Sequence, residues 1–217
     1  MGITQLPLLE PDIFSSLIKR TRIRSRGNCS FVTLRCWNPK YKAKQIEQVK
    51  SMKSISSSGI IKCVAKGLAD HLSGTFGTIK ELVVTSVPGG HSCSELSFSA
   101  KIAIEVARRL RTNHVKVWED RPRAGSPFPR PAHERPALKW IAHPRQPVIL
   151  IDDVVTSGSH MEECLHALRS NGIPTFGIAW IGGEAIDRRT TSTIRQTDVR
   201  AEASINYLGQ RSSKLLV

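Results

Sequence analysis

From residue 60 onward, the sequence alternates between stretches with helical spacing of apolar residues and short runs of aliphatic and β-branched residues. Val64, Ala65 and Leu68 follow the spacing of one helix face, and similar spacing recurs in residues 94–111 and 161–168. The strand-like runs are residues 81–87, 114–118, 147–151 and 175–181. Strands joined by crossover helices form a parallel sheet with helices on both faces, so we predict a Rossmann-like α/β fold.

The two ends of the chain lack this alternation. Residues 1–58 are basic and weakly periodic, apart from a strand-like run at 31–34, and residues 184–217 are polar. We therefore expect a core domain at residues 59–183, with residues 1–58 forming part of a cap or hood and residues 184–217 forming a peripheral segment.

The composition excludes several classes of protein. Five cysteines, with no Cys-x-x-Cys pair, argue against a disulfide framework or a zinc ribbon, and the opening residues lack the apolar core of a signal peptide. No apolar run reaches membrane-spanning length, so we expect a soluble cytoplasmic protein that makes no membrane contact. The net charge of +14 attracts polyanions, either phosphorylated metabolites or nucleic acid.

The stretch VILIDDVVTSGSH, residues 148–160, carries the clearest chemistry. Its aliphatic run predicts a strand buried on both faces, from which the chain emerges at Asp152 and Asp153. Two carboxylates there can accept hydrogen bonds from vicinal hydroxyls or face a divalent cation. The residues that follow enter a helix N-terminus, where backbone N–H groups, hydroxyls and the helix dipole favour an anion. We expect the anion to contact Thr156, Ser157, Gly158, Ser159 and His160.

A second loop follows the strand-like run 81–87 and would lie at the same edge of a parallel sheet, where such folds bind ligands. Its residues are Pro88, Gly89, Gly90 and His91. A third segment, 119–137, holds five prolines and several arginines and is long enough to be a functional loop. We cannot choose from sequence which cation of this region would contact a ligand; the candidates are Arg121, Arg123, Arg130, Arg135 and Lys139.

Residues 148–160 resemble the phosphoribosyl pyrophosphate signature of the type I phosphoribosyltransferase family, in which hydrophobics, two acids, two hydrophobics and a Thr/Ser-Gly loop follow one another. The resemblance covers roughly residues 60–181 and implies the fold of that family. It implies that Asp152 and Asp153 contact ribose hydroxyls, that residues 156–160 bind the 5-phosphate, and that residues 88–91 bind pyrophosphate. It also implies Mg²⁺, reached by the two acids through water, and a role in nucleotide metabolism.

The resemblance has departures and alternatives. His160 stands where the family usually has Thr or Ser, and the N-terminal and C-terminal segments match no subfamily. A Walker B strand would need a Gly-x-x-x-x-Gly-Lys-Thr/Ser loop, which the sequence lacks. Three hypotheses remain: a phosphoribosyltransferase acting on an acceptor base, a regulator that binds phosphoribosyl pyrophosphate without turnover, and a nucleic-acid-associated protein. A homodimer is also left open.

Overall fold

The computed structural model describes residues 10–77, 81–89, 96–121 and 137–184. The helices are α1 (Glu10–Ser16), α2 (Lys42–Ile55), α3 (Ser58–Phe76), α4 (Phe98–Leu110) and α5 (Ser159–Ser170). The strands are β1 (Ile18–Arg26), β2 (Cys29–Trp37), β3 (Val83–Ser86), β4 (Asn113–His114), β5 (Val148–Val155) and β6 (Thr175–Glu184). In this described part of the chain, no helix has the length and apolar character needed to span a membrane.

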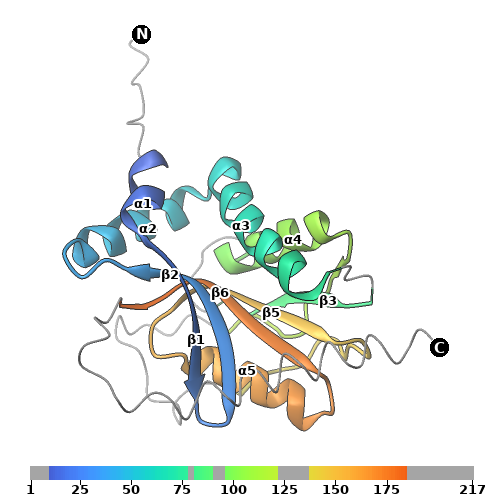
Figure 1. Cartoon of the computed structure of the whole chain (residues 1–217). Coiled ribbons are helices and arrows are strands. Elements are labelled where there is room, and N and C mark those ends of the chain that lie inside the picture. Colours follow the sequence, from blue (N-terminus) through green and yellow to red (C-terminus); the bar gives the residue numbers. More distant parts are fainter. Residues whose placement is uncertain (1–9, 78–80, 90–95, 122–136, 185–217) are drawn as a thin grey trace.

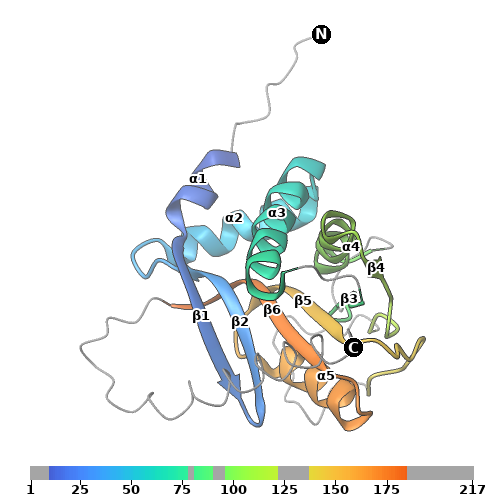
Figure 2. The same ribbon diagram turned by 45° about the vertical axis from the view of Figure 1, so that its right-hand side comes forward.

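The strands form one six-stranded sheet in the order β1-β2-β6-β5-β3-β4. Every neighbouring pair is parallel except β1 and β2, which are antiparallel. Helices α3 and α4 cover one face of the sheet and α5 lies on the other (Figures 1 and 2). The predicted α/β class, with a mostly parallel sheet between helices, is confirmed.

The central strand β5 is apolar because helices cover both of its sides. Ile149 and Ile151 pack with α3 and α4 in one core, whereas Val148 and Leu150 pack with α5 in another. All four are at most 1% exposed. Each such side chain contributes roughly 1.5–3 kcal/mol on burial, so this continuous run fixes β5 in the middle of the sheet.

The N-terminal segment contributes more to the sheet than its sequence pattern predicted. We expected residues 1–58 to belong to a cap, but β2 lies next to β6 inside the sheet and is parallel to it. The hairpin between β1 and β2 turns at Gly27, whose φ of 53° suits glycine. Two of the six strands therefore come from this segment.

Strand β5 is also longer than expected. It continues past the acid pair to Val155, and Asp152, Val154 and Val155 all pair with β6. The expectation that the chain leaves the sheet at Asp152 is wrong, because the neighbouring strand β6 is long enough to pair with it further. The acids therefore occupy strand positions, where successive side chains point to opposite faces.

Candidate active site at the carboxyl edge of the sheet

The two adjacent acids face different surroundings. Asp153 points to the face that carries Ile151 and α2, where its Oδ2 lies 2.8 Å from Nζ of Lys53. Its side chain is 9% exposed, so this ion pair is largely shielded from water on the acid side. Asp152 points to the α5 face, where its charge acts on the thiol of Cys164 and helps to raise the pKa of that thiol. The two carboxyl groups nevertheless remain within hydrogen-bond reach of each other, because a side-chain hydrogen bond from Asp153 is among the causes that raise the pKa of Asp152.

Burial raises the pKa of Asp152 well above its ordinary value, and the charge of Asp153 raises it further. Lys53 and the backbone N–H of Asp153, which donates to Asp152 Oδ1 at 2.9 Å, act in the opposite direction. Because desolvation is the largest cause, the neutral carboxyl is favoured there. Asp152 can then donate as well as accept a hydrogen bond, whereas an ionised Asp153 only accepts.

The loop after β5 has the geometry of an anion site. Gly158 has a φ of 80° and precedes Ser159, the first residue of α5. A Cβ built on Gly158 would lie 3.0 Å from Cζ of Phe31, so a larger residue there would be both strained and crowded. The hydroxyls of Ser157 and Ser159 lie 3.0 Å apart. The residues predicted to bind phosphate lie together in one short turn that leads into α5. Thr156, Ser157 and His160 are exposed, while Ser159 is buried.

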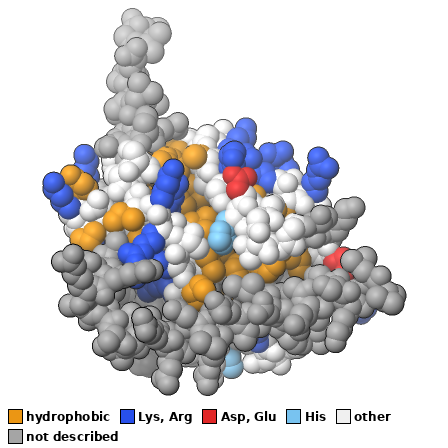
Figure 3. Space-filling view, in the orientation of Figure 1, with side chains coloured by type: hydrophobic (Ala, Val, Ile, Leu, Met, Phe, Trp, Pro, Cys, Tyr) orange, Lys and Arg blue, Asp and Glu red, His pale blue; other side chains and the backbone are white. Residues whose placement is uncertain are grey.

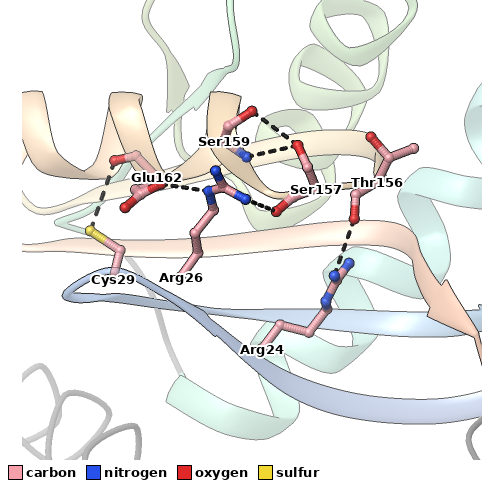
Figure 4. A network of polar contacts seen from close by, with 7 residues as sticks. All are labelled: Arg24, Arg26, Cys29, Thr156, Ser157, Ser159 and Glu162. Carbon is pink, nitrogen blue, oxygen red and sulfur yellow. Dashed lines mark hydrogen bonds and ion pairs between the residues drawn. The ribbon is translucent and has the colours of Figure 1, made fainter. Parts of the chain in front are cut away.

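Arg24 of β1 holds the first part of this loop through its backbone carbonyls. Its Nη1 donates to the carbonyl of Val155 at 3.0 Å. Its Nη2 donates to the carbonyl of Thr156 at 3.1 Å (Figure 4). With its carbonyls engaged on that side, the loop is held in one conformation. The residue also brings a positive charge to within hydrogen-bond distance of the loop that would bind an anion.

Arg26, two residues further along β1, holds the second part of the loop. Its Nη1 donates to the carbonyl of Ser157 at 2.9 Å, and its Nε donates to Oε2 of Glu162 on α5 at 2.7 Å (Figure 4). The sequence analysis missed both arginines, because it assigned this segment to a cap. A signal was present: Gly27-Asn28 is a typical two-residue hairpin turn, and it would have paired residues 18–26 with the strand-like run at 31–34.

The other predicted loop lies beside the acids. The N–H of Val87 donates to the carbonyl of Ile151 at 3.0 Å, which places Pro88 and Gly89 at the same edge. Asp120 Oδ1 accepts from the Gly89 N–H at 2.9 Å. Two predicted residues, Gly90 and His91, lie outside the described residues.

Gly89 could not be replaced by a larger residue without a shift of its neighbours. A Cβ there would lie 2.8 Å from Cβ of Ser97, the residue before α4. Close contact of this loop with the start of a helix leaves room only for backbone. Of the described residues of this loop, Pro88 has no N–H and the N–H of Gly89 is already donated to Asp120, so a pyrophosphate-binding role of residues 88–91 stays a prediction.

Two of the five cations proposed to close over a ligand are described, and both have partners. Arg121 is paired with Glu163 of α5, and its side chain is 11% exposed. Lys139 lies 3.6 Å from Glu119 in an exposed pair. The remaining candidates, Arg123, Arg130 and Arg135, lie outside the described residues.

No group of three or more His, Cys, Asp or Glu side chains within the described ranges is arranged to hold a metal ion. The acid pair is not a free two-carboxylate site either, since Asp153 is paired with Lys53. A divalent cation that takes most of its ligands from water and from a bound phosphate would still fit beside one acid.

These features describe a Rossmann-like α/β protein with an acid pair, a hydroxyl-rich turn and a glycine loop at one edge of its sheet. In comparisons with known proteins, no family model and no curated protein matches the chain. Solved structures overlap with it in part. A hypoxanthine phosphoribosyltransferase from Staphylococcus aureus is 15% identical, with a TM-score of 0.38, over 58% of this chain and 73% of that one.

Two further structures overlap to a similar degree. Adenine phosphoribosyltransferase from Saccharomyces cerevisiae, in complex with an imino-altritol bisphosphate and adenine, is 15% identical with a TM-score of 0.39, over 79% of this chain and 85% of that one. A hypothetical protein from Neisseria gonorrhoeae with bound ppGpp is 18% identical with a TM-score of 0.36, over 68% and 94%. TM-scores below 0.5 carry no functional argument, so function has to be argued from the chain's own residues.

Proposed function

We propose that this protein binds phosphoribosyl pyrophosphate at the carboxyl edge of β5 and transfers its phosphoribosyl group to an acceptor, expected to be a nucleobase. One observation carries the proposal. The turn at residues 156–160 combines a left-handed Gly158, the hydroxyls of Ser157 and Ser159, and the N-terminus of the twelve-residue helix α5, directly after two acids. That arrangement suits a ligand with ribose hydroxyls at one end and a 5-phosphate at the other.

In the proposed reaction, a nucleophilic atom of the acceptor forms a bond to the anomeric carbon while the bond from that carbon to pyrophosphate breaks. Pyrophosphate leaves with the electron pair, and the acceptor loses its proton to solvent or to a nearby base. The acids hold the ribose through its hydroxyls, and the turn anchors the 5-phosphate, so the chain contributes mainly positioning. Backbone N–H groups of the loop at residues 88–91 would stabilise the leaving charge.

Magnesium belongs to the proposal as an ion that the ligand brings with it. Bound, it would neutralise pyrophosphate charge through phosphate and water oxygens. Asp152 or Asp153 would reach it through water, because the ion pair of Asp153 with Lys53 opposes direct chelation by both acids. The protein's own task is then to hold the ribose and the 5-phosphate.

Titration of the protein with phosphoribosyl pyrophosphate, with and without Mg²⁺, tests binding. Release of pyrophosphate with a panel of bases tests transfer. We expect Asp152→Asn combined with Asp153→Asn to abolish transfer, because each amide replaces one acceptor oxygen with a donor nitrogen and cannot carry a negative charge. Asp70→Asn, on the exposed surface of α3, is the matched control and should change neither signal. Absence of phosphoribosyl pyrophosphate binding by the wild-type protein would refute the proposal.

Two other outcomes would redirect the assignment. Binding without turnover on any base would favour a regulator, and the ion pair between Asp153 and Lys53, which occupies one acid, is the feature that favours it. Tight binding of nucleic acid with a steep salt dependence, unaffected by the double substitution, would favour a nucleic-acid-associated protein with a net charge of +14.

A further inference from the structure

A second feature lies on the same sheet face as Asp153, over β6, β2 and β1. A cavity of about 330 Å³ opens there between α1, α3 and the sheet. This volume lies in the range of small-molecule sites. Figure 3 shows the corresponding face of the molecule, where hydrophobic side chains lie next to Lys and Arg side chains. None of the residues assigned to the proposed ribose and phosphate site lines this cavity.

The walls of the cavity are apolar. Phe14 of α1, Leu34 of β2 and Trp180 of β6 contribute to them. The ring of Trp180 is 3% exposed and packs against Phe14, with ring centroids 5.4 Å apart, so this wall is rigid. Gly67 of α3 also lines the cavity, and a Cβ built on it would meet nothing within 4 Å. The cavity therefore has an apolar floor and free space beside α3.

The charged groups that line the cavity are all cationic. Lys19, Arg20 and Arg35 contribute to it, and its described lining contains no acid. Nη1 of Arg35 is buried and has no hydrogen-bond partner among the described residues. Burial lowers the pKa of His71, another lining residue, so that side chain is neutral at pH 7. A buried guanidinium nitrogen without an acceptor is costly unless a ligand supplies one.

The backbone of β1 is irregular at this point. Lys19 pairs with Arg35 and Arg22 pairs with Thr33, so two residues of β1, Arg20 and Thr21, lie opposite one residue of β2. In a regular strand these two neighbours would point to opposite faces, whereas here both line the cavity. Such bulges redirect side chains and are frequent beside functional sites.

The cavity is also close to the proposed ribose site. Asp152 pairs with Ala179 and Val154 pairs with Ile181, so Asp153 lies directly opposite Trp180 on the neighbouring strand. Leu34 belongs to the next strand, and adjacent strands are about 4.8 Å apart. The apolar floor therefore begins one strand away from the acid that would hold the ribose, on the same face of the sheet.

We propose that this cavity is the acceptor site, and that the acceptor is a planar organic acid whose apolar body lies on Trp180 and Leu34 and whose anionic group is bound by Arg35 and its neighbouring cations. The binding of such an acid in the cavity is independent of the proposed function, whereas the role of the acid as acceptor rests on it. Arg35 lines the cavity together with Lys19 and Arg20, and the bulge brings Arg20 to the same wall, so three cations surround the place of the anionic group.

The experiment compares two probes by titration calorimetry on the full chain: 2-naphthoate and its neutral analogue 2-naphthamide. We expect the acid to bind at least tenfold more tightly than the amide. Arg35→Met should remove most of this preference. Equal affinity for the acid and the amide would overturn the inference, as would an acid preference that survives Arg35→Met unchanged.

Gly67→Leu fills the cavity from α3 without the strain that a buried substitution would create. It should weaken 2-naphthoate binding at least tenfold, and it should not lower the melting temperature because leucine favours a helix over glycine. Gly74→Leu is the matched control: it lies on the same helix, a Cβ there also meets nothing within 4 Å, and it does not line the cavity. Equal loss of binding in both variants would contradict the location of the site.

Phosphoribosyl pyrophosphate separates this inference from the proposed function. We expect it to bind wild type and Gly67→Leu equally, and to bind together with 2-naphthoate rather than displace it. Displacement would overturn the acceptor assignment. Binding of 2-naphthoate without any binding of phosphoribosyl pyrophosphate would leave the cavity in place and remove the transfer function, whereas the reverse result would remove only the cavity inference.

Discussion

The two faces of β5 treat adjacent carboxylates in opposite ways. On the face covered by α1 to α4, Asp153 is held as an anion by Lys53 at 2.8 Å. On the α5 face, burial and the charge of Asp153 favour the neutral form of Asp152. The turn at residues 156–160, which Arg24 and Arg26 hold, belongs to this second face, since Gly158 lies against Phe31. One acid is therefore paired with a cation, whereas its neighbour is held by burial in an environment that favours the neutral carboxyl.

This difference shows how a strand divides two identical residues between two tasks. The alternation of β5 places one acid among apolar side chains and the other beside a lysine, although the sequence shows only Asp-Asp. Asp153 is therefore suited to accept hydrogen bonds from ribose hydroxyls, while a protonated Asp152 can donate one. The pair then offers both kinds of partner to a diol.

Removal of the lysine should have the largest effect on stability. Lys53→Met leaves Asp153 buried without its partner, and we expect a loss of about 1–3 kcal/mol at pH 7, less than for a fully buried pair because Lys53 is 37% exposed. Chemical denaturation measures the loss. Lys50→Met, an exposed position on the same helix, should cost less than about 0.5 kcal/mol. Equal costs would show that the two faces do not differ in this way.

On the α5 face, the glycine of the phosphate turn should be nearly as sensitive. Gly158→Ala combines a φ of 80° with a Cβ 3.0 Å from Phe31, so we expect a destabilisation of about 1–3 kcal/mol. The turn should also bind ribose 5-phosphate more weakly, because its N–H groups shift. Thermal unfolding and titration measure the two effects. Gly74→Ala, at an open helical position, should be neutral or slightly stabilising, and a similar loss there would argue against a special role for Gly158.

The arginine that holds the turn should affect binding more than stability. Arg24→Met removes hydrogen bonds to the carbonyls of Val155 and Thr156, where water can replace the lost donors, so the cost in stability is small. Because these bonds act on the ligand through the loop, we expect about a tenfold weaker affinity for ribose 5-phosphate. Arg24→Lys should recover part of it. Arg108→Met on α4 is the control, since Arg108 pairs only with Glu105 among its described contacts. Unchanged affinity in Arg24→Met would mean that the turn holds its shape alone.

The sequence predicted the elements that carry simple periodicity. The helix face of Val64, Ala65 and Leu68 and the aliphatic run before the acids both have the expected roles, because their packing is encoded locally. The turn at residues 156–160 does lie at a helix N-terminus, as expected, and its binding of phosphate stays a prediction.

The parts that escaped prediction depend on contacts distant in sequence. Lys53 meets Asp153 across one hundred residues, and Arg24 meets Thr156 across a similar interval. In β1 the residues that pair with β2 are largely basic, so the alternation of the strand was hidden by charge. The different surroundings of the two acids could have been inferred from strand alternation, had β5 been expected to continue through them.

Asp152→Asn should change the melting temperature least among these variants. The direction of that change distinguishes the two faces most clearly. The folded-state pKa of Asp152 is raised, so the folded chain holds a proton that the unfolded chain releases first as pH increases. Wild-type stability therefore falls as pH rises from the ordinary Asp pKa through the raised value. The asparagine variant lacks this loss: its melting temperature should match wild type at acidic pH below the ordinary pKa and exceed it increasingly toward neutral pH.

Asp153→Asn should do the reverse and destabilise at neutral pH, because it leaves Lys53 unpaired. If both variants shift the melting temperature in the same direction at neutral pH, the two acids do not differ as the faces of β5 imply.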